Sequence, residues 1–439
     1  MKKNEFNAKF REHAKQKLSP TNAERNLVSI LYNEFQKVFN GNCIQIGSYP
    51  RFTATRPIHD LDILYILGNY DPQNVDPRAI LKQLQEDIRT KFKNPTKYKY
   101  DIELQTHSIA VTFLENNKEI FFVDIVPSYI SDCKNEFGDD TYWVPEIANV
   151  GYSKRNAYYQ QLSENSSTVS WIKSDPRGYI SLAQTVNQQS DDFRKVVKFL
   201  KTWKFECKKL YDDFKLKSFH IEQVIVGYFL RNPALDFFDA IFRFYLELED
   251  IISKPQIKDR ADDNKFIDDY VKELSRWKKE KILEARDDFM IKLEGFNSTS
   301  TVSALLSGGF YTRKCVAEQF LFDFGIPTFI DNTLSFMVDG YVRKKDGFRS
   351  GYWLSNNGDK VFRDLKIDFS LKTDNSNADL TKWKVRNSDG SSDPRGEITD
   401  NHTRYTPETS SFIGTHYVES YAIKNNTCVA RHKRNVIIK

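Results

Sequence analysis

The sequence has 439 residues, of which 40% are hydrophobic and 28% are charged, and it carries a formal net charge of +5. This length predicts two or three domains, and the composition excludes a chain that is disordered throughout. The mild positive charge permits a local surface for phosphates but is not typical of a protein that coats DNA.

The cysteines and the N-terminus indicate the cellular compartment. The five cysteines are scattered and include no Cys-x-x-Cys pair: Cys43, Cys133, Cys207, Cys315 and Cys428. An odd, dispersed set indicates reduced thiols rather than a disulfide framework or a zinc site. The first residues, MKKNEFNAKFREHAKQKL, lack the apolar segment of a signal peptide, and no stretch approaches the ~20 apolar residues of a spanning helix. We therefore expect a soluble, cytoplasmic protein without a membrane partner.

The N-terminal part of the chain predicts a helix followed by a mixed sheet. Thr21 and Glu24 fit a capping box, and apolar residues follow at helical spacing, so a helix is expected from about 22 to 39. CIQIGS is then a short strand that enters a turn, and DLDILYIL is a second strand. YDIELQTHSIAVTFL contains at least one more strand, and EIFFVDIVPSYI is an apolar strand that Pro127 closes.

From about residue 175 to Pro327 the pattern is helical. DDFRKVVKFLKTWKFECKKL carries one apolar stripe, formed by Phe193, Val196, Val197, Leu200, Trp203 and Leu210. FIDDYVKELSRWKKEKILEARDDFMIKL repeats this signal with Ile267, Val271, Leu274 and Trp277.

The remaining residues predict a small all-β domain, which we expect to be a sandwich. LSFMVDGYVRKKDGFRSGYWLSNNGDKVF places Asp-Gly and Asn-Gly turns between aromatic and β-branched runs. NSDGSSDPRGEI reads as a turn-rich loop. HYVESYAIKNNTCVARHKRNVII closes the chain with two strands around an Asn-Asn turn.

Two aspartates lie one residue apart in the second expected strand, shortly after a Gly-Ser turn. Asp60 and Asp62 point to the same face, because side chains alternate along a strand. Asp124 lies in another apolar strand, so three carboxylates converge if the two strands are neighbours. Such hard oxygen ligands suit Mg²⁺, which keeps waters and substrate phosphates as its other ligands. The turn at Gly47 and Ser48 offers backbone N–H groups and a hydroxyl that suit a triphosphate.

These segments carry a family resemblance. GSYPRFTATRPIHDLDILYIL followed by VDIVPSY resembles the nucleotidyltransferase superfamily with a polymerase-β-like core. Within it, RFTATRP is similar to the bacterial relatives of cyclic GMP–AMP synthase and oligoadenylate synthase, the DncV-like CD-NTases of the SMODS type. VVKFLKTWK, LKSFHIEQVI and CVAEQFLFDFGIPTF resemble their helical second lobe. TKWKVRNSDGSSDPRGEI and HYVESYAIKNNTCVARHKRNVII are similar to the adenylyl/guanylyl and SMODS C-terminal sensor domain.

The resemblance implies a fold, three domains and a set of catalytic residues. The fold would be an α/β nucleotidyltransferase core with a mixed sheet at 1–170, an α-helical second lobe at 171–327 and a small β-rich sensor domain at 328–439. Asp60 and Asp62 would hold two Mg²⁺ ions, with Mn²⁺ as an alternative. Asp124 would complete the site and help to activate the attacking hydroxyl.

The resemblance also implies nucleotide-binding residues, some of which have a simpler interpretation. Gly47 and Ser48 would grip the donor triphosphate. Lys201 and Lys204 share one helix face and would reach its β- and γ-phosphates, assisted by Ser218. As alternatives, the lysines form a solvated helix face and Ser218 caps the helix that follows. Arg51 and Arg56 hold the loop by ion pairing rather than contact the substrate.

The implied function is template-independent joining of nucleoside triphosphates, by a two-metal mechanism in which a ribose hydroxyl attacks an α-phosphorus. The product would be a cyclic or short linear oligonucleotide second messenger in bacterial anti-phage defence. A separate effector protein would respond to it, and an activating ligand would bind the C-terminal domain. Two alternatives stay open: synthesis of linear RNA or DNA, including protein-primed synthesis, and a catalytically silent nucleotide or ligand sensor.

Overall fold

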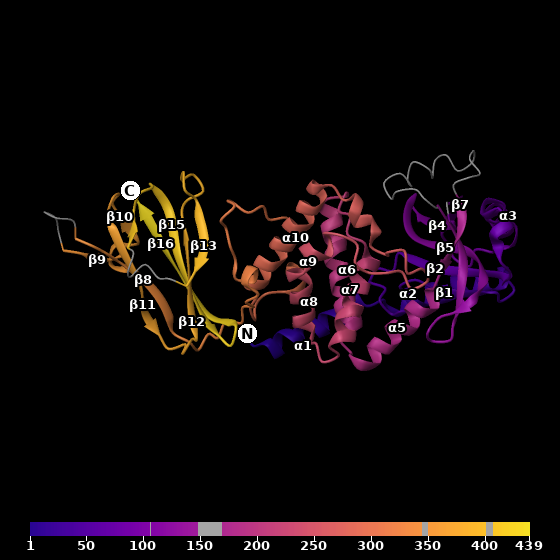
Figure 1. Cartoon of the computed structure of the whole chain (residues 1–439), viewed down its shortest axis with the longest axis horizontal. Coiled ribbons are helices and arrows are strands. Elements are labelled where there is room, and N and C mark those ends of the chain that lie inside the picture. Colours follow the sequence, from indigo (N-terminus) through magenta and orange to yellow (C-terminus); the bar gives the residue numbers. More distant parts are fainter. Residues whose placement is uncertain (106, 148–168, 345–349, 401–406) are drawn as a thin grey trace. The chain divides into compact units, whose positions relative to one another are not determined.

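The computed structural model describes residues 1–105, 107–147, 169–344, 350–400 and 407–439 (Figure 1). Within these residues the chain divides into two compact units, residues 10–279 and residues 1–9 with 280–439. The boundaries predicted at 170 and 327 stay predictions. None of the described helices is long and apolar enough to cross a membrane.

The first unit contains a seven-stranded mixed sheet. Five of its strands have the order β1-β2-β5-β4-β3, β6 pairs with β5, and β7 pairs with β6. The elements of the N-terminal part are α1 (Lys3–His13), a π-helical turn (Ala14–Leu18), α2 (Asn22–Val38), β1 (Cys43–Ile46), β2 (Asp60–Asn69), a 3₁₀ turn (Pro72–Asn74), α3 (Pro77–Lys91), β3 (Lys99–Leu104), β4 (Ile109–Glu115), β5 (Lys118–Lys134), β6 (Asp140–Ile147) and β7 (Val169–Ser174).

Alternation along the two central strands separates two faces of this sheet. Leu61 and Ile63 of β2, with Val123 and Ile125 of β5, are buried in a core that α2 and α3 cover. Residues between them on each strand point to the opposite face. The aspartates of β2 and β5 therefore lie on the face that α2 and α3 leave uncovered.

A helical region follows in the same unit (Figure 1). Its elements are α5 (Pro176–Gln189), α6 (Phe193–Leu210), α7 (Ser218–Arg231), α8 (Phe237–Leu246), α9 (Leu248–Ile251), a 3₁₀ turn (Asp269–Glu273) and α10 (Arg276–Glu294), whose C-terminal part belongs to the second unit. α6 packs on α7 and α8, and its Trp203 is buried against Phe214 and Tyr245. This packing fixes the helix that carries the predicted lysines.

The helix predicted from 22 to 39 is confirmed as α2, whose capping box of Thr21 and Glu24 is formed. The prediction that Pro127 closes a strand is wrong, because β5 continues to Lys134. Pro127 falls between the residues that pair with β4, which end at Ile125, and those that pair with β6. Its missing N–H therefore removes no ladder hydrogen bond on that side.

Two predictions about the helical region also need correction. The segment 266–293 is not one helix, since a short 3₁₀ turn precedes α10, and Trp277 at the start of α10 is 55% exposed. Leu210 is the last residue of α6 and is 62% exposed, so the buried stripe of that helix ends at Cys207. In both cases apolar residues continue at helical spacing in the sequence, although the neighbouring elements no longer cover them.

The second unit contains the predicted β-sandwich, together with short helical segments and the C-terminal part of α10. Its sheets have the orders β10-β16-β15-β12-β13 and β14-β11-β8-β9. Its elements are α11 (Val302–Leu306), 3₁₀ turns (Leu321–Phe324, Leu354–Asn357), β8 (Phe336–Val342), β9 (Tyr352–Trp353), β10 (Lys360–Val361), β11 (Lys366–Asp374), β12 (Leu380–Arg386), β13 (Arg395–Thr399), β14 (Glu408–Thr409), β15 (Gly414–Lys424) and β16 (Thr427–Ile438). Val338 and Phe369 from one sheet pack with Trp383 and Val418 from the other.

Some of the turns predicted from the sequence are present in this unit, and one is not. Asn425 and Asn426 have φ angles of 49° and 55° and connect β15 to β16, as expected for an Asn-Asn hairpin turn. The dipeptide Asp339-Gly340 is not a turn and lies inside β8, where buried Asp339 accepts a 2.6 Å hydrogen bond from Ser355 Oγ. The Asp-Gly dipeptide at 346–347 lies outside the described residues.

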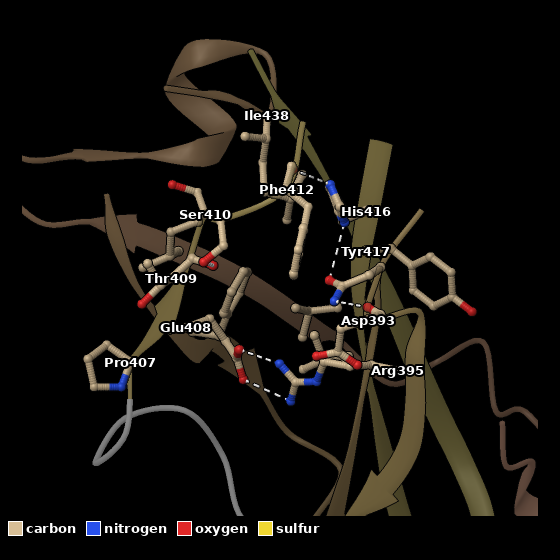
Figure 2. A pocket seen from close by; sticks show the side chains of 17 residues that line it. Asp393, Arg395, Pro407, Glu408, Thr409, Ser410, Phe412, His416, Tyr417 and Ile438 are labelled. Atoms are coloured by element: carbon tan, nitrogen blue, oxygen red, sulfur yellow. Dashed lines mark hydrogen bonds and ion pairs between the residues drawn. The ribbon is translucent and has the colours of Figure 1, made fainter. Parts of the chain in front are cut away.

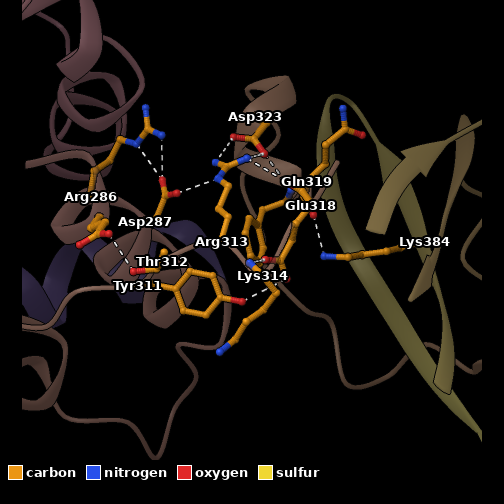
Figure 3. A network of polar contacts seen from close by, with 12 residues as sticks. Arg286, Asp287, Tyr311, Thr312, Arg313, Lys314, Glu318, Gln319, Asp323 and Lys384 are labelled. Atoms are coloured by element: carbon orange, nitrogen blue, oxygen red, sulfur yellow. Dashed lines mark hydrogen bonds and ion pairs between the residues drawn. The ribbon is translucent and has the colours of Figure 1, made fainter. Parts of the chain in front are cut away.

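The segment 311–323 connects α10 to the five-stranded sheet by polar contacts (Figure 3). Arg313 pairs at 2.8 Å with buried Asp287 of α10 and at 2.7 and 2.8 Å with Asp323. At the other end, Lys384 of β12 donates a 2.6 Å hydrogen bond to the carbonyl of Gln319. The segment 311–323 therefore links α10 to the sandwich through ion pairs and hydrogen bonds.

Candidate active site

The three aspartates predicted as ligands lie on two neighbouring strands. β2 and β5 pair in parallel, and Asp62 stands opposite Asp124 in register. Asp60 precedes Asp62 by two residues and shares its face. The condition set by the sequence, that the two strands are adjacent, is therefore met, and the three carboxylates gather on one face of the sheet.

Gly47 packs directly against this group. Its φ angle is +74°, and a Cβ built on it would lie 1.6 Å from Oδ2 of Asp62. Glycine is needed both for the left-handed backbone and for the close approach of the carboxylate. The turn is closed by a 3.0 Å hydrogen bond from Thr53 N to the carbonyl of Ser48. The Ser48 hydroxyl has no hydrogen-bond partner in the part of the chain that the structure describes.

The carboxylates occupy an unfavourable electrostatic environment. Burial, together with repulsion from Asp60 and Asp124, raises the pKa of Asp62 well above its ordinary value. Burial also raises the pKa of Asp60, against the opposing effect of Lys201, and raises that of Asp124, against the opposing effect of His107. A raised pKa means that the charged carboxylate is disfavoured, so the positive groups of the protein do not fully compensate the negative charge of these three aspartates.

The residues fit a bound divalent cation. Oδ1 of Asp124 is buried and has no hydrogen-bond partner among the described residues. Within the same residues, no three His, Cys, Asp or Glu side chains form a metal-holding group by themselves. Mg²⁺ is usually bound through one or two carboxylates, and waters and substrate phosphates complete its shell. The three aspartates lack a fully compensating positive charge, and this is compatible with Mg²⁺ binding that waters and substrate phosphates complete.

A buried ionic cluster supports the turn at Gly47. Glu222 of α7 is fully buried and accepts contacts from Arg51 at 2.5 Å, Lys201 at 2.6 Å and Thr53 Oγ1 at 2.8 Å. Burial alone would raise the pKa of Glu222, but Arg51 and Lys201 outweigh burial and hold the pKa at about 2. The ion pair expected for Arg51 is present, whereas its lack of contact with the substrate stays a prediction. The phosphate role of Lys201 stays a prediction, because its ammonium group is 2.6 Å from Glu222.

Lys204 and Ser218 come together one helical turn away. Nζ of Lys204 lies 3.5 Å from the hydroxyl of Ser218. Burial, with Lys208 and Lys201 nearby, lowers the pKa of Lys204 to about 8. The alternative in which Ser218 caps α7 is wrong, because the N-cap is Lys217 and no side chain caps the helix. The pair is half-buried, and the described residues include no carboxylate partner for Lys204.

Two residues at the site were given no role in the sequence analysis, although Glu222 lies in the segment LKSFHIEQVI that carried the resemblance. Glu222 lies four residues after Ser218, and this helical spacing, which places both on one side of α7, was a usable signal. His107, in the loop before β4, lies with Nε2 3.9 Å from Oδ2 of Asp124. No pattern in the sequence indicated that contact, because it depends on the pairing of β4 with β5.

Residues 314–439 match the family model of the Adenylyl/Guanylyl and SMODS C-terminal sensor domain. No curated protein matches the sequence. The resemblance that the sequence indicated for the C-terminal domain is thus confirmed.

Among solved structures, CdnC of Escherichia coli MS115-1 with ATP is similar with a TM-score of 0.51 and 18% identity, over 70% of this chain and 99% of that chain. DncV of Escherichia coli, in its 3′-deoxy GTP-bound form, gives a TM-score of 0.42 and 12% identity, over 65% and 75%. The CdnE cyclic dinucleotide synthase of Elizabethkingia meningoseptica, with GTP and Apcpp, gives 0.40 and 14%, over 56% and 84%. The first match shows that the chain has the fold of the predicted family, and the other two carry no argument.

Proposed function

We propose that this chain is a template-independent nucleotidyltransferase that joins nucleoside triphosphates into a cyclic or short oligonucleotide second messenger. The observation that carries the proposal is the register of Asp62 with Asp124, which brings three uncompensated carboxylates together beside Gly47. The fold shared with CdnC supports it. The biological setting proposed with it is bacterial anti-phage defence.

In this proposal Asp60, Asp62 and Asp124 hold Mg²⁺ or Mn²⁺ in a two-metal arrangement. When bound, the metal neutralises phosphate charge and favours loss of the hydroxyl proton. A ribose 2′- or 3′-hydroxyl attacks the α-phosphorus, an O–P bond forms, and pyrophosphate leaves. The buried Oδ1 of Asp124 has no other partner in the described residues and accepts the proton of the attacking hydroxyl.

The donor triphosphate is held by the turn and by α6. The backbone N–H groups at Gly47 and the unpartnered hydroxyl of Ser48 face the anionic oxygens, as in other phosphate-binding turns. Lys204 supplies a positive charge that is not committed to a carboxylate, with Ser218 beside it. Lys201 is assigned mainly to the support of the turn, because it is paired with Glu222.

Replacing Lys204 by glutamine is expected to raise the KM for the donor triphosphate about 10- to 100-fold, the effect of losing one charge-assisted contact. The thermal midpoint should change little, since the lysine has no ion-pair partner to leave behind. Lys209→Gln, at an exposed lysine of the same helix that pairs with Glu206, is the matched control. Equal KM values for the two variants would contradict the phosphate role of Lys204.

The proposal is tested by turnover. The purified chain is incubated with Mg²⁺ or Mn²⁺ and labelled ribo- or deoxynucleoside triphosphates, alone and mixed, and products are resolved after phosphatase treatment. A resistant small product, absent in the Asp60→Asn/Asp62→Asn variant, is the expected result for a cyclic messenger. A phosphatase-sensitive ladder, or label on the protein, would instead favour linear synthesis. Metal-dependent triphosphate binding without product would favour a silent sensor.

The proposal includes partners beyond the substrate. The product acts on a separate effector protein, and an activating ligand binds the C-terminal sensor domain. We place the enzyme in the cytoplasm, where nucleoside triphosphates are available and where its five free cysteines stay reduced.

A further inference from the structure

The sandwich of the second unit contains a cavity of about 290 Å³ at one end, between its two sheets (Figure 2). Its floor is apolar and is made by core residues of both sheets: Ile367, Phe369, Val418, Val436 and Ile438. Protein interiors are close-packed and leave few voids larger than a water molecule. An opening of this size into a sandwich core has nearly the volume of a small-molecule site.

An ion pair spans the mouth of the cavity. Arg395 of β13 lies 2.6 Å from Glu408 of β14, and these two strands are edge strands of different sheets. The backbone of Arg395 is left-handed, with φ +49°, and this residue lies next to an irregularity in the β12–β13 pairing. Such a conformation in a residue other than glycine is unfavourable and is common at ligand clamps. It directs the guanidinium across the opening (Figure 2).

Carboxylates outnumber cations around this opening. Asp393 and Glu408 both line the cavity, and Arg395 is the only lysine or arginine among its described lining residues. Burial lowers the pKa of His416, whose Nε2 donates at 2.7 Å to the carbonyl of Phe412. Nδ1 of His416 faces the backbone N–H of Ser388 at 3.1 Å and Oδ1 of Asn387 at 3.2 Å, so both ring nitrogens are occupied by the protein. An anionic ligand is therefore disfavoured at this mouth.

We propose that this cavity binds a small organic cation, in which an ammonium or guanidinium group is attached to an apolar body. The body rests on the apolar floor, and the cationic head lies between Asp393 and Glu408, where it completes the charge balance with Arg395. This inference deepens the sensor role included in the proposed function and rests on it for its biological purpose. The binding itself is independent of nucleotide chemistry.

The wall of the cavity is connected to α10. The carbonyl of Arg395 accepts a 3.0 Å hydrogen bond from Cys315 Sγ, and the carbonyl of the next residue, Gly396, accepts one of 3.0 Å from Gln319 N. Both donors belong to the segment 311–323, in which Arg313 pairs with Asp287 of α10. The strand that carries the clamp is thus held by the network of Figure 3.

The test uses three probes of matched shape: 3-phenylpropylamine, 3-phenylpropan-1-ol and 3-phenylpropionate. Binding to the full chain is measured by titration calorimetry and ligand-observed NMR, with no nucleotide present. We expect the amine to bind saturably, with a dissociation constant of about 1 mM or tighter for a ligand of this size. The alcohol should bind more weakly and the carboxylate weakest. Carboxylate or alcohol binding as tight as that of the amine, or no saturable binding, would overturn the proposal.

Two variants locate the site. Asp393→Asn removes an exposed rim carboxylate and is expected to weaken amine binding about 2- to 5-fold, and adding Glu408→Gln should bring the loss to about 10-fold or more. Asp374→Asn, at the far end of β11, is the matched control and should leave binding unchanged. Unchanged amine binding in both mouth variants would overturn the assignment. Because no triphosphate is used, a failure of the proposed nucleotidyl transfer would leave these outcomes unaffected.

Discussion

The Asp62→Asn variant is expected to unfold at a higher temperature than the unmodified chain while it loses nucleotidyl transfer. Burial and the charges of Asp60 and Asp124 raise the pKa of Asp62 well above its ordinary value, so its carboxylate destabilises the metal-free protein. Asparagine keeps the shape and removes the charge. We expect a gain on the order of 1 kcal/mol in the free energy of unfolding without metal, and a loss of turnover of about 10³-fold or more.

The stability measurement separates a functional carboxylate from a structural one. Thermal unfolding is followed with EDTA and again with Mg²⁺, which should stabilise the unmodified chain more than the variant, since only the former keeps the full ligand set. Asp101→Asn, an exposed aspartate on β3 of the same sheet, should change neither stability nor turnover. If the Asp62→Asn variant were less stable than the unmodified chain in EDTA, the charge of Asp62 would not be what destabilises the metal-free protein.

The residues of the candidate site that could be predicted from the sequence are those whose arrangement follows from local spacing. The Asp-x-Asp spacing fixes a shared face, and the Gly-Ser turn precedes it by a short interval, so Asp60, Asp62 and Gly47 could be assigned before any coordinates. That Asp124 stands opposite Asp62 required the parallel pairing of β2 with β5, which the sequence raised only as a condition. Asp124 was proposed from its place in a second apolar strand, and the family resemblance then supported its role.

The errors lie where tertiary partners override local signals. Asp339-Gly340 has the composition of a turn, yet it lies inside β8 because Ser355 Oγ donates a hydrogen bond to the buried carboxylate. A Cβ on Gly340 would approach Leu354 to 2.7 Å, so glycine is used here for packing rather than for turn geometry. Likewise, the role of Lys201 could not be assigned from helix spacing, because its partner Glu222 lies on another helix.

The Glu222→Gln variant is expected to be severely destabilised. Glu222 is fully buried, and its removal leaves Arg51 and Lys201, which are 7% and 8% exposed, without a compensating charge. Breaking a buried pair in this way typically costs about 3–5 kcal/mol. Glu206→Gln, which breaks the exposed pair with Lys209 on α6, should cost about 0.5 kcal/mol or less. Chemical denaturation of the two variants gives the comparison.

Acid dependence and a compensating replacement make this prediction specific to the ionic cluster. The folded-state pKa of Glu222 is about 2, below its ordinary value of 4.5, so its contribution is present above pH 4.5 and is lost as pH falls toward 2. The difference in unfolding free energy between the unmodified chain and Glu222→Gln should therefore shrink over that interval. Replacing Arg51, Lys201 and Glu222 together by apolar residues of similar volume should restore most of the stability. The same triple variant should still turn over poorly, because Thr53 loses the carboxylate that anchors the turn at Gly47. A triple variant with full turnover would show that the cluster serves stability alone.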